Sequence, residues 1–276
     1  MSKVLIAING WVKGATNGDH QAIRDTYAKE ISAYPNLDLR FFIGNGTSFE
    51  GDEDKLLHSL NNKFACPGHQ EKAMSTRKDG PFSYSPREDE IILPCPDGYF
   101  YVSMKTKENH RWALAQGYDY VFQACTDTFI DIPKLMRSGF EGKDYIGTRI
   151  GIQNEWYAAG GCGCWHSKRA CQIIVGSQPD DWAEDRWTGV LLQKNGVKFH
   201  HDARYAGGGK FPHSNNDIIT SHLCDTPRTY NNSEMHDAYR RSKEVSSTRP
   251  HSEHYGKAIG HQYAADGLTR QWVKRN

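Results

Sequence analysis

The pattern of apolar and polar positions predicts an α/β chain that opens with a β-α-β unit. Val4 to Ile8 forms a β-branched apolar run, which is typical of a buried strand. After a turn at Gly18, apolar residues recur at helical spacing from Ile23 to Tyr34. A second apolar run at residues 37–43 predicts the next strand. This succession indicates the start of a parallel sheet.

Further elements follow a stretch without a regular period. Residues 63–86 are rich in Gly, Pro, Ser and charge, and this composition predicts an inserted surface loop. Strands are expected at residues 90–93, 118–124, 145–150 and 197–200. Helices are expected at residues 99–116, 132–136, 167–175 and 184–195, with Ser167 as an N-cap and Gly176 and Gly196 after the last two. From residue 226 onward the chain is polar and basic with no clear period.

Composition excludes several classes of protein. The 276 residues are 37% hydrophobic and 24% charged, enough for one large α/β domain. The net charge of +1 argues against a chain that binds nucleic acid over its whole surface. No window approaches the ~18 apolar residues of a membrane span, and the first apolar run is too short for a signal peptide, so we expect a cytoplasmic protein. The seven scattered cysteines predict reduced, buried thiols.

Candidate chemistry begins directly after the strand predicted at residues 118–124. Asp127 stands there, and ligands of open α/β sheets bind beyond the carboxyl ends of strands. A carboxylate at that edge is suited to hold a divalent cation on a diphosphate, although Asp is also a common turn residue. Farther along, Gly160 and Gly161 lie in a glycine-rich segment, which indicates either tight packing or backbone close to a ligand.

Two more positions carry chemistry. An acidic cluster at residues 180–185 contains Glu184 and Asp185 beside Trp182, at the start of a predicted helix. It fits a general base next to a sugar-stacking ring, or acids that the helix dipole favours. His222 ends a short apolar stretch. A lone histidine is often structural, but imidazole suits a manganese-type site that already holds a carboxylate.

The order of these segments resembles the β-1,3-glycosyltransferase family, which includes the β-1,3-galactosyltransferases and, more closely, the Fringe enzymes. The resemblance covers residues 1–225. It is carried by AIRDTY at 22–27, RFFIG at 40–44, DEII at 89–92, DGY at 97–99, SMKT at 103–106, CTD at 125–127, AGGCG at 159–163, ED at 184–185 and SHL at 221–223.

The resemblance implies a GT-A fold, a Rossmann-like mixed sheet flanked by helices in a single catalytic domain. Residues 1–130 would bind the nucleotide sugar, residues 131–225 would bind the acceptor, and residues 226–276 would form a basic, aromatic C-terminal extension. The implied reaction is inverting transfer of a sugar from a nucleoside-diphosphate donor, usually UDP-linked, to an acceptor hydroxyl, with Mn²⁺ or Mg²⁺ as cofactor.

Carried over residue by residue, the resemblance assigns Asp127 and His222 to the metal and Asp185 to the general base. Where the family carries its first two motif acids, this chain has Cys125 and Thr126, so the resemblance leaves the metal affinity and the identity of the donor open. The remaining candidates are divided between the two substrates: Arg24, Lys105, Asp127, Gly160 and Gly161 at the donor, and Trp182 and Glu184 at the acceptor.

The acceptor stays open. Residues 226–276 contain nine Lys/Arg and five Asp/Glu with Tyr and Trp interleaved, which suits either a phosphate backbone with stacked bases or a solvated tail. Hydroxymethylated bases of DNA are therefore one candidate acceptor, and glycans or lipid-linked sugars are others. A non-catalytic sugar-nucleotide- or carbohydrate-binding protein is the alternative class. A Rossmann oxidoreductase would need a G-x-G-x-x-G after the first strand, which is missing.

Overall fold

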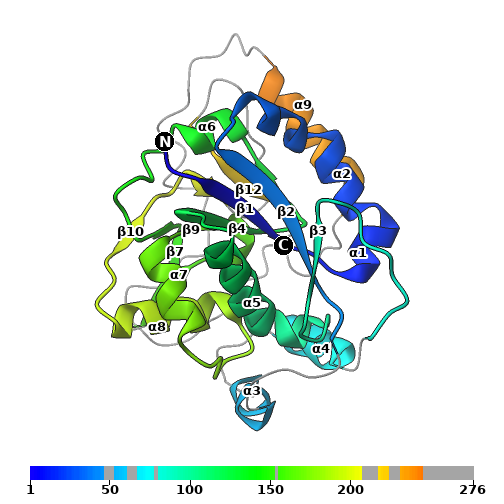
Figure 1. Ribbon diagram of the computed structural model, residues 1–276, viewed down its shortest axis with the longest axis vertical. Helices are drawn as coiled ribbons and strands as arrows, with labels where there is room; N and C mark the ends of the chain where they lie inside the picture. The colour runs from blue at the N-terminus through cyan, green and yellow to red at the C-terminus, as the bar shows by residue number, and fades with distance from the viewer. Residues whose placement is uncertain are drawn as a thin grey trace, which may run out of the picture.

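A seven-stranded sheet runs through the centre of the molecule (Figure 1). The computed structural model describes residues 1–46, 53–60, 67–77, 80–152, 155–206, 217–223 and 231–244. Across the sheet the strands are β10 (Phe199–His201), β6 (Tyr145–Gly147), β9 (Cys164–Ser167), β4 (Tyr120–Cys125), β1 (Val4–Asn9), β2 (Leu37–Gly44) and β3 (Glu90–Leu93).

One strand of this sheet runs against the others. β9 is antiparallel to both β4 and β6, whereas the other neighbouring pairs are parallel. Asn9 pairs with Cys125, so the carboxyl ends of β1 and β4 are level. The predicted α/β class with a mixed sheet is confirmed.

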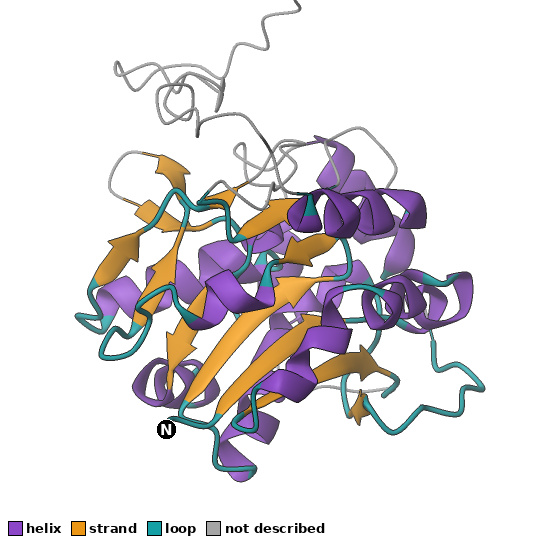
Figure 2. Cartoon of the chain, turned by 90° about the horizontal axis from the view of Figure 1, so that it is seen from above, coloured by secondary structure: helices purple, strands orange, loops and turns teal. Residues whose placement is uncertain are grey.

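Helices cover both faces of the sheet (Figure 2). Alternation along β1 separates two cores, because Val4, Ile6 and Ile8 point to one face and Leu5 and Ala7 to the other. The first core is closed by α2 (Asp19–Asp25), the 3₁₀ helix η1 (Tyr27–Ala33), α6 (Ile132–Met136) and α9 (Asn232–Lys243). The second is closed by α3 (Glu53–Leu60), α4 (Pro67–Thr76), η2 (Tyr99–Tyr101), α5 (Val102–Ala115) and α7 (Lys168–Val175).

Two smaller sheets flank the main one. They consist of β11 (Tyr205–Ala206), β12 (Thr220–His222) and β5 (Thr128–Ile130), and of β7 (Arg149–Ile152) with β8 (Glu155–Ala158). The single strand predicted at residues 145–150 is therefore wrong, since it divides into β6 and β7. Between them the Thr148 hydroxyl lies in hydrogen-bonding reach of the carbonyls of Asp202 and Tyr205.

The predicted first helix is broken into shorter pieces. An additional helix, α1 (Val12–Asn17), precedes Gly18, whose φ of 99° ends it. α2 then ends at Thr26, whose φ of −118° and ψ of −116° are not helical. The Thr26 hydroxyl donates to the carbonyl of Ala22 at 2.6 Å, and the chain continues as the 3₁₀ helix η1.

The loop predicted at residues 63–86 contains the helix α4 instead. Ala73 is fully buried in the second core. The hydroxyl of Thr76 accepts a hydrogen bond from the backbone N–H of Tyr99 at 2.9 Å. Tertiary contacts with η2 therefore hold α4 in place, although its own sequence has no apolar stripe.

A helix also appears where no period was expected after residue 226. α9 begins with a capping box, in which Asn231 and Glu234 satisfy each other's backbone N–H groups. Met235 and Ala238 are fully buried and join the first core beside α2 (Figure 1). Part of the predicted C-terminal extension is thus packed against the α/β core.

Two composition-based expectations can be compared with the structure. None of the helices in the described ranges is long and apolar enough to cross a bilayer. The five cysteines of the described ranges are free, and all except the half-buried Cys125 are buried, as predicted.

We expect Met235→Ala to lower the free energy of unfolding by about 2–5 kcal/mol, because it removes a fully buried side chain from the contact between α9 and the core. The exposed neighbour His236 provides the matched control, His236→Ala, which should change stability by less than ~0.5 kcal/mol. Urea unfolding measures both variants. Equal stabilities would show that α9 is not docked.

Candidate functional site

Asp127 and His222, far apart in the sequence, meet beyond the carboxyl end of β4. The Oδ2 atom of Asp127 lies 3.4 Å from Nε2 of His222. Asp127 stands in the tight connection between β4 and β5, and His222 is the last residue of β12. Their side chains are 21% and 30% exposed, so a ligand in solution can reach both.

Hydrogen bonds of neighbouring residues hold Asp127 and His222 close together. β12 runs antiparallel to β5, with His222 opposite Thr128. The backbone N–H of Leu223 donates to the carbonyl of Asp127 at 2.8 Å. The Thr128 hydroxyl accepts from the backbone N–H of Cys125 at 3.1 Å and donates to the carbonyl of Gly161 at 3.0 Å. The turn that carries Asp127 is thus tied to the glycine segment.

Gly160 and Gly161 form a floor between His222 and Glu184, where a Cβ atom would force a neighbouring side chain to move. A Cβ atom on Gly161 would lie 2.6 Å from the ring of His222. A Cβ atom on Gly160 would lie 2.6 Å from Oε1 of Glu184 and 3.3 Å from Cβ of Asp185. The two glycines therefore let backbone pass between His222 and the acids that begin α8 (Glu184–Lys194).

Glu184 and Asp185, the two acids that begin α8, differ in their surroundings. Burial raises the pKa of both carboxyl groups, and the charge of Asp185 raises the pKa of Glu184 further. Asp185 accepts hydrogen bonds from the backbone N–H of Gly160 at 3.3 Å and of Arg186 at 2.7 Å, which partly offset burial. Of the two, Asp185 is therefore the group that ionises more readily, as a general base must.

Asp127 has the features of a cation ligand. Burial alone would raise its pKa, but the charge and hydrogen bond of His222, with help from Lys72, hold that pKa below its usual value. Its Oδ1 atom is buried and has no hydrogen-bond partner among the described residues. The described residues contain no cluster of three or more His, Cys, Asp or Glu side chains fit to hold a metal. Asp127 and His222 would therefore supply two ligands, and bound oxygens the rest.

Three predicted site residues are engaged in packing or ion pairs. Arg24 forms a bidentate salt bridge with Asp89, with hydrogen bonds of 2.8 and 2.7 Å, and also an ion pair with Glu90. Lys105 is buried, and its ammonium donates to the carbonyl of Gly10 at 2.8 Å and to that of Asp97 at 3.0 Å.

Trp182 is the third of these residues. Its ring is 4% exposed, and it packs edge-on against Tyr99 with centroids 5.6 Å apart. The backbone N–H of Trp182 donates to the Ser59 hydroxyl of α3 at 3.0 Å. The contact to Tyr99 links the entrance of α8 to η2 and α4. Stacking of Trp182 on an acceptor sugar stays a prediction.

Three residues that the sequence reading did not select lie around the same group of acids. Asp19, at the start of α2, accepts a hydrogen bond from Trp11, and burial together with the charge of Asp127 raises its pKa. Tyr99 is near enough that the charges of Glu184 and Asp185 add to the burial that raises its pKa. Lys72 of α4 lies over the Tyr99 ring, 4.8 Å from its centroid.

A cavity of about 450 Å³ lies next to this group rather than within it. It opens between α3 and α8 and is lined by residues that include Ser59, Gln178, Asp181, Arg186 and Lys194. Asp181 and Arg186 form an ion pair with each other there. The cavity is thus on the side of α8 away from Gly160, to which Asp185 is bonded.

Comparisons with known proteins do not assign the chain to a family. No family model matches it, and a search of curated proteins finds no match. Among solved structures, it is similar to an inositol-1-phosphate CTP transferase from T. maritima, with 13% identity, 89% of this chain and 98% of that chain covered, and a TM-score of 0.38.

Two other similar structures are an active-site mutant of LgtC and the glycosyltransferase GlyE. An active-site mutant of LgtC has 10% identity over 88% of this chain and 97% of that chain, with a TM-score of 0.37. The apo form of the glycosyltransferase GlyE from Streptococcus pneumoniae has 9% identity over 89% of this chain and 61% of that chain, with a TM-score of 0.38. Similarity at these identities and TM-scores assigns neither a family nor a function to the chain.

We expect Gly161→Ala to push the His222 ring away from Asp127, because the new methyl group would lie 2.6 Å from the ring. Without that partner, burial dominates and the pKa of Asp127 rises. Carboxyl NMR titration of the metal-free protein measures the change. Gly176→Ala, whose nearest neighbour is a carbonyl oxygen at 3.3 Å, is the control and should leave the pKa of Asp127 unchanged. An unchanged value in Gly161→Ala would contradict the contact.

Proposed function

We propose that the protein is an inverting, metal-dependent glycosyltransferase of GT-A type, which moves a sugar from a nucleoside-diphosphate donor, by the family resemblance UDP-linked, to an acceptor hydroxyl. The observation that carries the proposal is the convergence of three groups. A carboxylate–imidazole pair, Asp127 and His222, and a raised-pKa carboxylate, Asp185, lie on opposite sides of a floor made of two glycines.

The division of labour follows from the chemistry of each group. Asp127 and His222 would hold Mn²⁺ or Mg²⁺ through the unpartnered Oδ1 and the imidazole. A bound divalent cation supplies Lewis-acid neutralisation of the charge on the leaving diphosphate. The two glycines let the backbone pass close to His222 and Glu184, which keeps the metal-binding pair and the acid pair near each other.

Asp185 acts as the general base on the acceptor side. In the transfer step the bond between the anomeric carbon and the diphosphate oxygen breaks, and its electron pair leaves with the diphosphate. A bond forms between the anomeric carbon and the acceptor oxygen on the opposite face. The acceptor proton passes to the carboxylate of Asp185. Glu184, the member of the pair with the higher pKa, keeps its proton and offers a donor to acceptor oxygens.

The acceptor remains a proposal from the sequence. Of the five aromatic residues interleaved with the basic C-terminal segment, Tyr239 packs against the first core, and the other four lie outside the described residues. Hydroxymethylated DNA bases, glycans and lipid-linked sugars are acceptors to be tested in parallel once the donor is known.

We expect Asp185→Asn to lower the turnover number by about 10²–10⁴-fold while leaving donor affinity nearly unchanged, because the amide cannot take the proton. In the unmodified protein, turnover should fall with decreasing pH. Burial raises the pKa of Asp185, so this loss occurs well above the ~4 of an ordinary aspartate. Steady-state kinetics of sugar release from UDP-sugars across the pH range measures both effects.

The exposed acid Asp180 offers a matched control for this experiment. Asp180→Asn changes the same net charge near the start of α8 and should keep normal turnover. Near-normal turnover in Asp185→Asn would remove that residue from the role of base. Donor binding without any sugar release would favour a non-catalytic sugar-nucleotide-binding protein.

We expect Asp127→Ala to abolish the part of nucleotide affinity that depends on Mn²⁺, because it removes one of two protein ligands. Isothermal titration calorimetry of UDP with and without Mn²⁺ measures that part. Asp237→Ala, at an exposed position of α9, should behave like the unmodified protein. If the Mn²⁺-dependent affinity survives in Asp127→Ala, the metal assignment is wrong.

A further inference from the structure

The proposed donor site has an unbalanced charge. Asp127, Glu184 and Asp185 converge on it, and Asp19 is close enough for its pKa to respond to Asp127. Even with Glu184 protonated, a diphosphate that enters this group of acids meets like charges. Positive charge besides a divalent cation would have to come from side chains of the chain.

Three other basic side chains considered for this role are engaged in ion pairs. Arg24 is neutralised by Asp89 and Glu90, and Arg186 is paired with Asp181. The buried ammonium of Lys105 donates to two backbone carbonyls and lies 3.4 Å from the carboxylate of Asp97. Each of the three positive charges is therefore already paired with a carboxylate.

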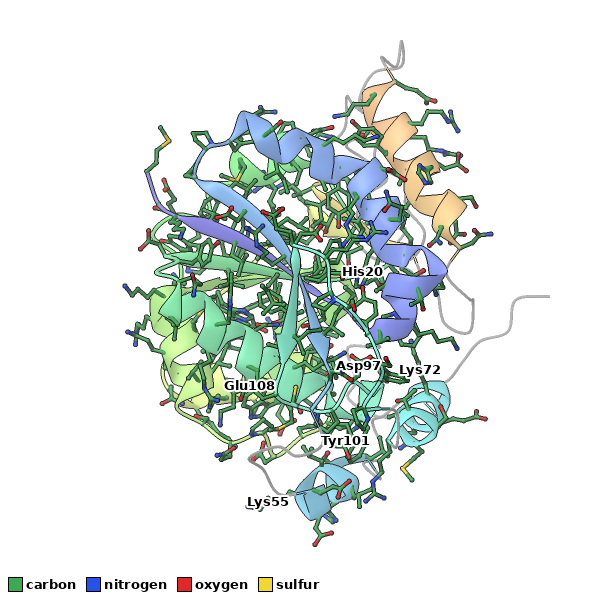
Figure 3. The ribbon with its side chains drawn as sticks, turned by 45° about the vertical axis from the view of Figure 1, so that its right-hand side comes forward. His20, Lys55, Lys72, Asp97, Tyr101 and Glu108 are labelled. Atoms are coloured by element: carbon green, nitrogen blue, oxygen red, sulfur yellow. The ribbon has the colours of Figure 1, made fainter. Side chains whose placement is uncertain are left out.

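Lys72 is in a different situation. It is exposed on α4 and, within the described ranges, its ammonium forms no ion pair. Figure 3 labels Lys72 on α4. The ammonium lies 4.8 Å from the centroid of Tyr99, the residue that packs against Trp182 at the entrance of α8. A cation held over a ring in this way keeps its charge and its three donors available.

We infer that Lys72 is an anion-binding position of the donor site, which contacts the diphosphate of a nucleoside-diphosphate sugar opposite Asp127. This inference deepens the proposed function and rests on it for the identity of the donor. It also gives α4 a role, since this helix brings a cation to a site whose acids come from the β4–β5 turn and from α8.

In the transfer step the ammonium of Lys72 stays protonated throughout. The electron pair of the broken bond between the anomeric carbon and the oxygen goes to the diphosphate. The N–H groups of Lys72 donate to the oxygens on which that charge grows. Lys72 thus binds the donor in the ground state and stabilises the departing group in the transition state.

The experiment compares four proteins: unmodified, Lys72→Met, Lys72→Arg and Lys168→Met. Lys168 is an exposed lysine whose backbone bonds to Asp119, before β4, and it therefore lies at the opposite edge of the sheet from Asp127. Isothermal titration calorimetry with Mg²⁺ uses inorganic pyrophosphate, UDP and uridine as probes. Thermal unfolding verifies that all four proteins are folded.

We expect Lys72→Met to weaken binding of pyrophosphate and of UDP by about 10-fold to 100-fold, the usual loss for a charged hydrogen bond. Uridine, which has no phosphate, should bind as before. Lys72→Arg should restore most of the affinity, and Lys168→Met should match the unmodified protein. A purely structural role of Lys72 would not be selective for phosphate.

The outcomes separate the two proposals. Equal pyrophosphate affinity in Lys72→Met and in the unmodified protein overturns the anion position, even if the protein transfers sugars. Failure of the unmodified protein to bind pyrophosphate overturns it as well. Pyrophosphate binding that depends on Lys72, without sugar release from any nucleoside-diphosphate sugar, supports the anion position and removes the transferase.

Discussion

Pairing of β12 with β5 brings His222 to Asp127, and the rest of the site is arranged around that contact. The hydrogen bond from Leu223 to the carbonyl of Asp127 fixes the register of the two strands. Thr128 then ties the same turn to Gly161. Because the glycine lies against the His222 ring, the position of each partner depends on the other two. The imidazole, the carboxylate and the floor form one unit rather than three separate features.

Electrostatics sets a second constraint on this unit. Carboxylates that are brought together in partly buried surroundings raise one another's pKa unless a cation or hydrogen-bond donors compensate. Asp127 has His222 beside it, and Asp185 has backbone N–H groups, whereas Glu184 has neither to the same degree. Different compensation gives chemically similar groups different protonation states, and this is how one small site can hold both a cation ligand and a base.

Sequence reasoning succeeded where the signal is local. Buried strands such as Val4–Asn9, and the capped helix Lys168–Val175 with its Ser167 N-cap, follow from short patterns that tertiary contacts do not override. The closeness of Asp127 and His222 could be predicted only through the family resemblance, because periodicity carries no information about contacts between distant segments.

The missed elements have a common physical cause. α4 owes its place to contacts between Ala73 and the second core and between Thr76 and Tyr99, so its own sequence shows no stripe. For this reason Lys72 was not selected. α9 is different, since its capping box at Asn231 and Glu234 was readable, but the polar composition around it masked the two buried positions. The break between β6 and β7 lies at Thr148, and the apolar pattern of residues 145–150 does not mark it.

The reversed direction of β9 has a consequence for where backbone can enter the site. Cys164, the first residue of β9, pairs with Gln123 near the end of β4, so β9 starts at the edge where β4 finishes. A parallel strand in that position would begin at the opposite edge of the sheet, and the residues before it would lie far from Asp127. Through this inversion the glycine turn that leads into β9 lies beside the turn that carries Asp127, so a segment that would otherwise connect elements at the far edge becomes part of the candidate site.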